Sequence, residues 1–518
     1  MDLAGSRRAA VCSNKGDLNV GDGCVLAIDL GTGGPKVALV DTQGRTLAWR
    51  NAPVATTILD GGGAEQDPHQ MWSALVAACR ATVAAVQPLP PLLAVAVTSQ
   101  YMSLVPIARD GTPTGPSINW MDSRGAAGNL ELLTDETFMM FLERHGIIPL
   151  PSGHDNVAHA RVLRQFHPDA YDAAAALVEP MDYLTARLTG RITSTQSTSF
   201  SFLSVDNRTW GAVEHSDDLL TASRLDPSKV APLVPMSGVI GELLPSVAAE
   251  LGVPAGIPVV PGTIDSITSA VGTGALTPAD AAVVIGTTAV IVTHIPDHRS
   301  NLEASLVSVP SPVPGMYYVM AENGIGGRAF EWAQHFLGYA SAEAAFADAA
   351  EVPVGSGGVG FLPWLIGSMA PSMNDDIRGA FVGLGLEHDR RHAIRAAAEG
   401  VALNLAWLRP VVESFTGRAV THVPFGGGGA SSPLWAQILS EAMGVPVHRL
   451  AEPRATNARG AAFLALADLG LISLGDVPGL LEVAQVHEPT DQGRVVMGQG
   501  LARLAAMHGA LVAQTAAG

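Results

Sequence analysis

The sequence predicts an α/β protein made of two similar halves. Near the N-terminus an apolar strand, residues 24–30, runs into the turn Gly31-Thr32-Gly33 and leaves it through a second apolar strand, residues 36–41. The same order of strand, Gly-Thr turn and strand returns at residues 281–294, around Gly286-Thr287-Thr288. A layout that recurs within one chain indicates two related structural units.

Length and composition agree with a large globular enzyme. The chain has 518 residues, which suggests two to four domains, and 47% of its residues are hydrophobic. Its net charge of −18 argues against a nucleic-acid partner. The same negative charge disfavours a nucleotide, so a nucleotide site would need backbone N–H groups, Lys or Arg, and Mg²⁺ around the phosphates.

Cysteine content and hydropathy bear on the compartment. Three cysteines, Cys12, Cys24 and Cys79, are too few and too scattered for a disulfide framework. We find no apolar run of the 18 to 20 residues that a membrane helix needs, and we expect no membrane partner. Residues 1–20 look like a disordered extension whose apolar stretch is too short for a signal peptide. We therefore expect a cytoplasmic protein.

The first half reads as a meander followed by a helix and a returning strand. Residues 46–50 continue the two opening strands into an antiparallel meander. Asp67-Pro68 is a helix start, and the helix extends over residues 67–86. Residues 93–98 form a buried strand, and helices follow residues 118–124 up to Gly190, which stands in a helix-stop position.

The second half repeats this plan. A long helix is expected at about residues 387–415, a strand at 421–425 and helices at 434–443 and 456–469. The domain boundaries that we predict are 21–270 for an N-terminal domain, 271–480 for a C-terminal domain and 481–518 for a closing helix.

Asp29 is the first candidate for chemistry. It lies near the end of the first buried strand, just before Gly31-Thr32-Gly33. A tight hairpin turn is the simpler interpretation. However, a buried carboxylate is costly unless it is used, and the Gly-Thr turn recurs in the second half. We therefore favour phosphate binding by the backbone N–H groups and hydroxyls of these turns, with Mg²⁺ held by Asp29 through water.

Asp265 is the second candidate. It lies in Pro261-Gly262-Thr263-Ile264-Asp265-Ser266, between the two Gly-Thr turns in the sequence. It could cap a helix that starts at Ser266. Alternatively, it could accept the proton of a hydroxyl that is being phosphorylated. Taken with the phosphate turns, Asp265 points to a phosphotransferase that acts on a small alcohol.

Other polar residues are weaker candidates. The glycines of Gly426-Gly427-Gly428-Gly429, between a strand and a helix, let the backbone approach a nucleotide base or ribose, or form a plain loop. Asp122 and Arg124 could be a surface ion pair or recognise a polyol. We interpret His154 with Asp155 and His159, and His388 with His392, as ordinary helix and loop residues rather than as metal ligands.

Together these residues resemble the FGGY carbohydrate kinases, within the sugar kinase, actin and heat-shock ATPase superfamily. The resemblance covers residues 24–475. Its most specific part is Gly379-Ala380-Phe381-Val382-Gly383-Leu384, followed by His392 and Glu399. Further matching motifs are Asp-x-Gly-Thr at 29–32, Trp-x-Asp-x-Arg at 120–124, Asp-Tyr-Leu-x-x-x-Leu-Thr-Gly at 182–190, Gly-x-x-Asp at 262–265 and Gly-Gly-Gly-Ala-x-Ser-x-x-Trp at 427–435.

The resemblance implies two ribonuclease-H-like, or actin-like ATPase, domains that flank a cleft in which ATP, Mg²⁺ and sugar meet. It implies that Asp265 is the general base and that Asp29 holds Mg²⁺. Residues of three further groups would bind ligands. The residues next to the ATP phosphates would be Gly31, Thr32, Gly33, Lys36, Gly286, Thr287 and Thr288. The residues bordering the adenine and ribose would be Gly428, Gly429, Ala430, Ser432 and Gln437. The sugar would be bound by Asp265 together with Gln100, Tyr101, Met102, Asp122 and Arg124.

Several positions depart from the family pattern. Gly33 stands where Ser is usual, and a second family signature, near residues 159–163, is not matched. Glycerol kinases carry Arg-Glu at the positions of Tyr101 and Met102, so glycerol is disfavoured. In xylulokinases Gln100 fits, but a His stands where this chain has Met102.

The overall layout is nearest to xylulokinase. It predicts an ATP-dependent kinase of a ketose or polyol, and a D-xylulose-like pentulose is the favoured substrate. Kinases of ribulose, erythritol or arabitol, and a non-catalytic nucleotide-binding regulator, are the alternatives. The sequence leaves open whether the protein forms a homodimer.

Overall fold

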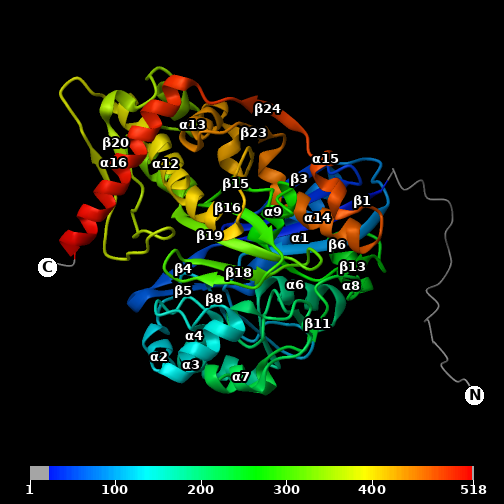
Figure 1. The fold of residues 1–518 in the computed structure, drawn as a ribbon. Helices are drawn as coiled ribbons and strands as arrows, with labels where there is room; N and C mark the ends of the chain where they lie inside the picture. The colour runs from blue at the N-terminus through cyan, green and yellow to red at the C-terminus, as the bar shows by residue number, and fades with distance from the viewer. Residues whose placement is uncertain (1–22, 516–518) are drawn as a thin grey trace, which may run out of the picture.

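The computed structural model describes residues 23–515 and contains two halves, each built on one large mixed β-sheet (Figure 1). The first sheet has the strand order β12-β13-β6-β1-β2-β3, with β14 also paired to β6. The second has the order β17-β18-β19-β16-β15-β22-β23-β24. The predicted extension at residues 1–20 and Cys12 lie outside the described residues.

The strands of the first sheet are β1 (Cys24–Gly31), β2 (Gly34–Asp41), β3 (Thr46–Asn51), β6 (Leu92–Ser99), β12 (Gly241–Glu242), β13 (Pro258–Val259) and β14 (Thr263–Ile264). Those of the second are β15 (Ala282–Ile285), β16 (Thr288–Ile295), β17 (Ser300–Asn301), β18 (Leu306–Pro310), β19 (Tyr317–Ile325), β22 (Val423–Gly426), β23 (Val447–Leu450) and β24 (Val483–His487).

The strand pairing confirms the internal duplication. In the first sheet β1 is antiparallel to β2 and parallel to β6. In the second sheet β15 is antiparallel to β16 and parallel to β22. In both halves the hairpin strand then pairs antiparallel with a further strand, β2 with β3 and β16 with β19. The two Gly-Thr turns therefore occupy equivalent places, each between the two strands of its hairpin.

The main helices begin and end close to the predicted residues. Asp67 caps α1 by accepting the N–H of His69, and Gly190 ends α6 in the left-handed conformation that glycine adopts without strain. These helices are α1 (Pro68–Ala84), α6 (Pro180–Thr189), α9 (Asp265–Gly272), α12 (Arg390–Thr416), α13 (Pro433–Met443) and α14 (Thr456–Asp468). Helix α10 (Gly327–Phe336) was not predicted.

Smaller elements extend the first half. A three-stranded sheet of β4 (Thr56–Leu59), β5 (Gly63–Gln66) and β8 (Ser117–Ile118) lies beside a group of short helices. Figure 1 shows these helices gathered at the bottom of the molecule, away from α12, α13 and α16 at the top. The helices at the bottom are α2 (Ala126–Leu130), α3 (Asp135–Met140), α4 (Asn156–Phe166) and α7 (Asp217–Ser223).

The two halves meet where α9 crosses α14. An added Cβ at Gly460 of α14 would overlap the carbonyl oxygen of Thr268, and one at Gly272 of α9 would overlap the carbonyl oxygen of Thr456. The backbones of the two helices are therefore in direct contact. Helix α14 also packs against β1 and β6, so a late segment of the chain helps to cover the first sheet.

The C-terminal region differs from the closing helix that we predicted. Strand β24 comes first and pairs antiparallel with β23 at the edge of the second sheet. Only then does α16 (Asp491–Thr515) follow. Of the helices in the described part of the chain, α16 alone has the length and apolar composition of a membrane span, which the sequence analysis missed. It packs against α12 and α13, so it is not a clear membrane helix.

Candidate active site

The first sheet brings Asp29 and Asp265 to the same edge. Asp29 of β1 lies opposite Thr98 of β6, and Thr98 lies opposite Thr263 of β14 on its other side. Asp265 follows Thr263 by two residues. Because β1, β6 and β14 run parallel, their carboxyl ends meet at one edge, which is where ligands bind in open α/β sheets. The structure thus places Asp29 and Asp265, which the sequence analysis assigned to one site, at the same edge of the first sheet.

The structure does not support the simpler interpretation that Asp265 caps a helix starting at Ser266. Helix α9 begins at Asp265 itself, and its N-cap residue is Ile264, which has no side chain that could cap it. The carbonyl oxygen of Asp265 accepts a hydrogen bond from the Thr268 hydroxyl at 2.9 Å. The carboxylate of Asp265 therefore does not cap α9 and is left for another purpose.

The surroundings of Asp265 favour its neutral form. Burial is the main cause, and the negative charges of Asp29 and Glu322 add to it, so that the pKa of Asp265 is raised to about 7. The N–H of Ser266 and the charge of Lys36 act in the opposite direction. A carboxylate with a pKa near neutrality is suited to act as a general base, and perturbed carboxylates of this kind concentrate at functional sites.

Glu322 is a residue that the sequence analysis missed. It belongs to β19 of the second half, opposite Val290 of β16, and burial raises its pKa to about 7, while a hydrogen bond from Thr288 opposes the shift. Although Glu322 belongs to the other half of the molecule, its negative charge helps to raise the pKa of Asp265. Nothing in the local sequence marks Glu322, because its position depends on how β19 pairs within the second sheet.

We predict that Asp265 sets the acid limb of the activity profile and that Glu322 shifts it. Proton acceptance requires ionised Asp265, so kcat/KM should rise with pH up to about 7, the pKa of that group. Replacing Glu322 with Gln removes a negative neighbour and lowers the pKa of Asp265, so the rise should move to lower pH. Glu303→Gln, at an exposed position, is the control. A Glu322→Gln profile identical to that of the wild type would contradict the prediction.

The β1–β2 turn has the features of a phosphate loop. Lys36 donates a hydrogen bond to Asp29 at 3.2 Å, and the two residues lie opposite each other in the hairpin. Gly33 is exposed, and an added Cβ there would meet no atom within 4 Å. Gly31 has similar space, with its nearest atom at 4.0 Å. The turn therefore leaves room for a ligand to approach its backbone.

The equivalent turn of the second half is arranged similarly. An added Cβ at Gly286 would also meet no atom within 4 Å, and Thr288 begins β16 directly after it. The carbonyl oxygen of Thr287 accepts the N–H groups of Gly326 and Arg328, at 3.1 and 3.2 Å. These bonds join the turn to the start of α10.

The glycine loop after β22 combines one open and several packed positions. An added Cβ at Gly428 would meet no atom within 4 Å, whereas one at Gly429 would lie 2.8 Å from Cβ of Ile285. Ala430 is fully buried. Gly428 is thus the member of the loop that leaves space for a nucleotide, and Gly429 and Ala430 pack beneath it.

Two side chains predicted to border the nucleotide have structural partners. The Ser432 hydroxyl caps α13 by accepting the N–H of Trp435 at 3.2 Å. The Gln437 amide donates to the carbonyl oxygen of Glu488 at 3.0 Å, which ties α13 to the segment after β24. Contact of either residue with adenine or ribose stays a prediction.

The predicted sugar side contains a buried network around Gln100. This side chain is 3% exposed and donates to Oε1 of Gln66 at 2.6 Å. Asn119 donates to the amide oxygens of both Gln66 and Gln100, at 3.1 and 3.2 Å. Gln66 and Asn119 are two further residues that sequence reasoning did not single out.

Tyr101 and Met102, the two residues that follow Gln100, differ in backbone conformation and in side-chain surroundings. Met102 has a φ of 57°, a left-handed conformation that is strained for a residue with a side chain. The Tyr101 hydroxyl is buried, and the negative charges of Glu179 and Asp155 add to burial in raising its pKa. That hydroxyl lies among groups of the first half, so direct sugar binding by Tyr101 stays a prediction.

Asp122 and Arg124 form a buried ion pair rather than a surface one. Arg124 contacts Asp122 at 2.6 Å and Glu65 at 2.7 Å, and Asp122 also accepts the N–H of Ala64 at 2.9 Å. The Asp122 side chain is fully buried. These bonds fix β5 against the segment that follows β8. Their geometry gives the pair a structural role, and polyol recognition by it stays a prediction.

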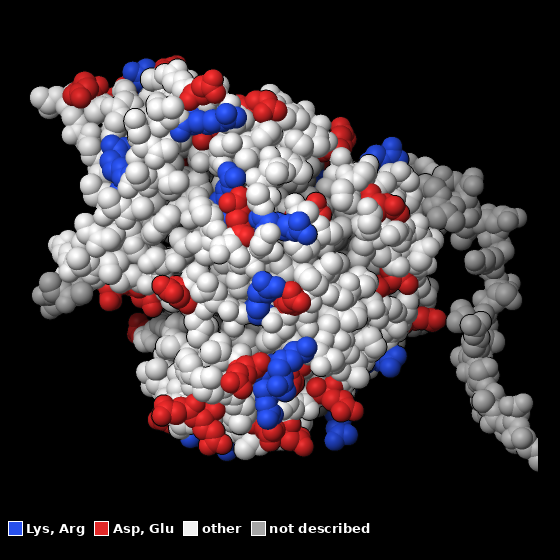
Figure 2. Space-filling view, viewed as in Figure 1, with Lys and Arg blue, Asp and Glu red and all other residues white. Residues whose placement is uncertain are grey.

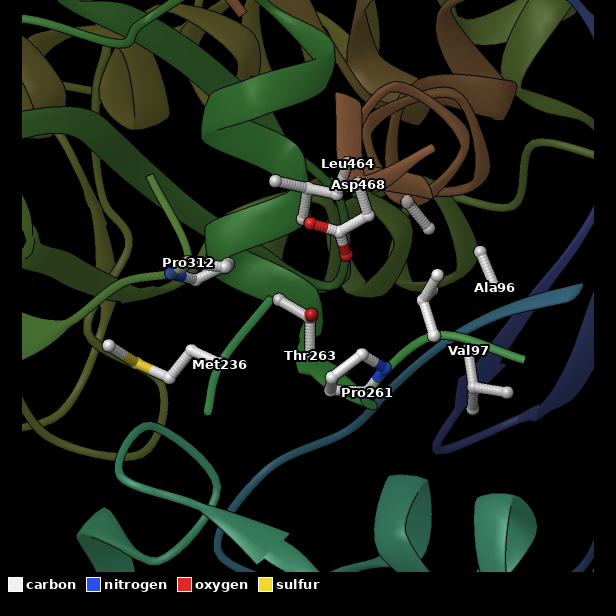
Figure 3. Close-up of a pocket in the computed structure, with 10 residues that line it drawn as sticks. Ala96, Val97, Met236, Pro261, Thr263, Pro312, Leu464 and Asp468 are labelled. Carbon is white, nitrogen blue, oxygen red and sulfur yellow. The ribbon is translucent and has the colours of Figure 1, made fainter. Parts of the chain in front are cut away.

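A small cavity lies behind the strand that leads to Asp265 (Figure 3). It offers only about 10 Å³ to water, which is about one water molecule and far too little for a sugar. Figure 3 shows the Asp468 carboxylate of α14 pointing into the cavity, with Thr263 and Pro261 beneath it. We assign the cavity to the packing between α14 and the first sheet.

Sequence comparison identifies the class of protein to which this site belongs. The N-terminal domain of the FGGY family of carbohydrate kinases matches residues 24–272, and the C-terminal domain of that family matches residues 281–469. The chain belongs to the FGGY family of carbohydrate kinases. It is therefore a sugar kinase with the two-domain fold of this family.

Individual members of the family are similar over most of the chain. A xylulose kinase of Klebsiella pneumoniae is 29% identical over 473 residues, which are 90% of this chain and 95% of that protein. A gluconokinase of Bacillus subtilis is 24% identical over 80% of this chain and 82% of its own length. The crystal structure of the xylulose kinase from Rhodospirillum rubrum superposes with a TM-score of 0.79, at 26% identity, over 94% of this chain and 99% of that one.

The FGGY signature itself serves the structure of the second half. Residues 380–382 form β21 (Ala380–Val382), which pairs with β20 (Gly360–Leu362). Glu399 of α12 is buried and accepts hydrogen bonds from the Ser356 hydroxyl at 2.7 Å and from the N–H of Gly355 at 3.0 Å. The signature therefore fixes a loop to α12.

Proposed function

We propose that this FGGY kinase transfers the γ-phosphoryl group of Mg²⁺-ATP to a hydroxyl of a small ketose or polyol, with a D-xylulose-like pentulose as the first candidate. The observation that carries the proposal is the placement of Asp265. It lies at the edge of the first sheet beside Asp29, and the pKa of its carboxyl is raised to about 7.

The residues around Asp265 fit Mg²⁺ and ATP. Asp29 supplies a hard oxygen ligand, as Mg²⁺ prefers, and would hold the ion through water. Gly33, Gly286 and Gly428 each leave open space where a Cβ would stand, so phosphates and nucleotide can approach the backbone. Lys36 brings a positive charge to the same turn. Kinases of this family use ATP, which supplies the phosphoryl group while Mg²⁺ neutralises the charge that develops on it.

The proton transfer falls to Asp265. Its carboxylate would accept the proton of the acceptor hydroxyl as the oxygen of that hydroxyl forms its bond to phosphorus and the bond from phosphorus to ADP breaks. Its raised pKa keeps the carboxylate a strong enough base for this step near neutral pH. Thr288 and the turn at Gly286 would surround the transferring group from the second half.

The choice of sugar rests on the overall likeness to xylulose kinases and on Gln100. Met102, two residues after Gln100, stands where the xylulokinase pattern has a His, and its backbone is left-handed. A thioether accepts hydrogen bonds only weakly. We therefore expect the sugar to be held mainly by Gln100 and Asp265, with an apolar contact at Met102.

The test is coupled ADP release over a panel of D-xylulose, L-xylulose, D-ribulose, L-ribulose, D-gluconate, glycerol, erythritol and D-arabitol. A strong response to D-xylulose supports the full proposal. A strong response to a different member keeps the kinase but replaces the sugar. No response from a protein that binds Mg²⁺-ATP would overturn the proposal in favour of a non-catalytic regulator.

A separate prediction concerns Asp29. Asp29→Ala should raise the Mg²⁺ concentration needed for half-maximal activity by roughly 10–100-fold, as is usual when an outer ligand of a metal is lost. Titration of MgCl₂ at fixed ATP measures this, and Asp60→Ala, at an exposed position, is the control. An unchanged Mg²⁺ dependence would remove Asp29 from the metal site.

A further inference from the structure

The amide of Gln66 has a hydrogen-bond partner for each of its donors and acceptors. Nε2 donates to the carbonyl oxygen of Thr32 at 2.8 Å and to the Thr56 hydroxyl at 3.0 Å. Oε1 accepts from Gln100 at 2.6 Å and from Asn119 at 3.1 Å. A primary amide has two N–H donors and two lone pairs, so its orientation is fully fixed. The side chain is only 2% exposed.

Three of these four bonds, those with Thr32, Gln100 and Asn119, join two parts of the site that are distant in the sequence. Thr32 belongs to the β1–β2 turn, which we propose binds phosphate, whereas Gln100 and Asn119 belong to the proposed sugar side. Gln66 is the last residue of β5, which belongs to the small sheet with β4 and β8 and not to the large sheet that carries Thr32 and Gln100. Between these two regions it forms a direct bridge made of one side chain.

The Thr32 hydroxyl is held as well. Nε1 of Trp120 donates to it at 2.9 Å. Because an indole N–H can only donate, the hydroxyl must accept in this bond. Its own proton is then free to point elsewhere, toward an acceptor such as a phosphate oxygen. Thr32 is thus fixed at its carbonyl by Gln66 and at its hydroxyl by Trp120.

Gln100 keeps capacity for a ligand. Within residues 23–515 its side chain makes one donated and one accepted hydrogen bond, which leaves one N–H and one lone pair. A sugar hydroxyl that bound the free N–H or lone pair of Gln100 would be connected through Gln66 to the carbonyl oxygen of Thr32. Networks of buried hydrogen bonds of this kind strengthen one another.

We propose that Gln66 is a positioning residue that couples sugar binding to nucleotide binding. The proposal rests on the function proposed above. When a sugar orders Gln100, Gln66 holds the Thr32 carbonyl and with it the β1–β2 turn in the geometry that receives the phosphates. The sugar should therefore increase the affinity for nucleotide, and by reciprocity the nucleotide should increase the affinity for sugar.

The measurement is the dissociation constant of Mg²⁺-AMP-PNP by calorimetry, without and with a saturating concentration of the panel sugar of highest turnover, D-xylulose on the proposed function. In the wild type we expect the sugar to lower this constant by about 5–150-fold, the usual range of coupling between sites. In Gln66→Glu, which removes the amide N–H donors to Thr32 and Thr56, the ratio should fall toward one.

Two variants control for packing and charge. Thr56→Val removes a partner of the same Nε2 without touching the path from Gln100 to Thr32, so its ratio should stay near that of the wild type. Gln43→Glu introduces the same change at an exposed turn and should alter nothing. If Gln66→Glu does not fold, Gln66→Met takes its place, since it keeps the length of the side chain, removes the hydrogen bonds to Thr32 and from Gln100 and should also lower the ratio.

The outcomes separate this inference from the proposed function. A Gln66→Glu ratio equal to that of the wild type overturns the coupling while the kinase remains. A loss of the ratio in Thr56→Val as large as in Gln66→Glu also overturns it, because general packing of the small sheet then explains the effect. A wild type that binds Mg²⁺-AMP-PNP but phosphorylates no panel sugar overturns the proposed function, and the coupling with it.

Discussion

Asp265→Asn is expected to lower kcat by about 10²–10⁴-fold, the usual contribution of a positioned general base. The amide has the shape of the carboxylate but cannot accept the proton of the acceptor hydroxyl. The dissociation constant of Mg²⁺-AMP-PNP should change little, because Asp29 and the glycine turns are untouched. Steady-state ADP release and calorimetry on the same preparation measure both quantities.

Two comparisons make this test decisive. Asp169→Asn, at an exposed position on the first half, should retain full activity. In addition, the removal of a negative charge near Asp29 should not harm the fold, so the melting temperature of Asp265→Asn should be no lower than that of the wild type. A variant that binds nucleotide and turns over at the wild-type rate would show that Asp265 is not the base.

Gly460→Ala is expected to have the largest effect on folding. The new methyl group would overlap the carbonyl oxygen of Thr268 and approach the N–H of Gly272 to 2.8 Å. Neither neighbour can move alone, because both belong to the backbone of α9. Helices α9 and α14 must separate, and overpacking of this kind costs about 1–3 kcal/mol or more.

Denaturant unfolding of Gly460→Ala and Gly509→Ala provides a matched comparison. Gly509 lies in α16, and an added Cβ there would meet no atom within 4 Å. That substitution should stabilise the protein slightly, by up to about 1 kcal/mol, because alanine is the better helix former. Equal unfolding midpoints for the two variants would contradict the contact between α9 and α14.

The sequence was sufficient to predict the parts of the fold that depend on local pattern. The hairpin of β1 and β2 and its counterpart at β15 and β16 follow from apolar runs around Gly-Thr turns. Helix α1 follows from Asp67-Pro68 and its apolar spacing. Strand β24 was missed, since four of its five residues are exposed and it carries no buried apolar pattern. It exists because β23 offers an edge with which it can pair.

The site shows the same division. Asp29 and Asp265 were recognisable, because carboxylates at the ends of apolar strands are costly unless they have a function. Gln66 and Glu322 were not, because their role depends on which residues the fold brings next to them. Gln66 contacts Thr32 and Gln100, each 34 positions away. For Asp122 and Arg124 the sequence suggested sugar binding, whereas the structure shows a buried ion pair that also includes Glu65.

The charge of the chain bears on the end of the catalytic cycle. In Figure 2 acidic side chains gather over the lower part of the molecule, in keeping with the net charge of −18, and three carboxyl groups, Asp29, Asp265 and Glu322, lie at the proposed reaction centre. An uncharged sugar diffuses into such a site without electrostatic resistance. Its phosphate ester carries about two negative charges at neutral pH. On the proposed function, release of the product is then favoured once Mg²⁺ has left with the nucleotide, because the negative charges of the protein repel the phosphate ester.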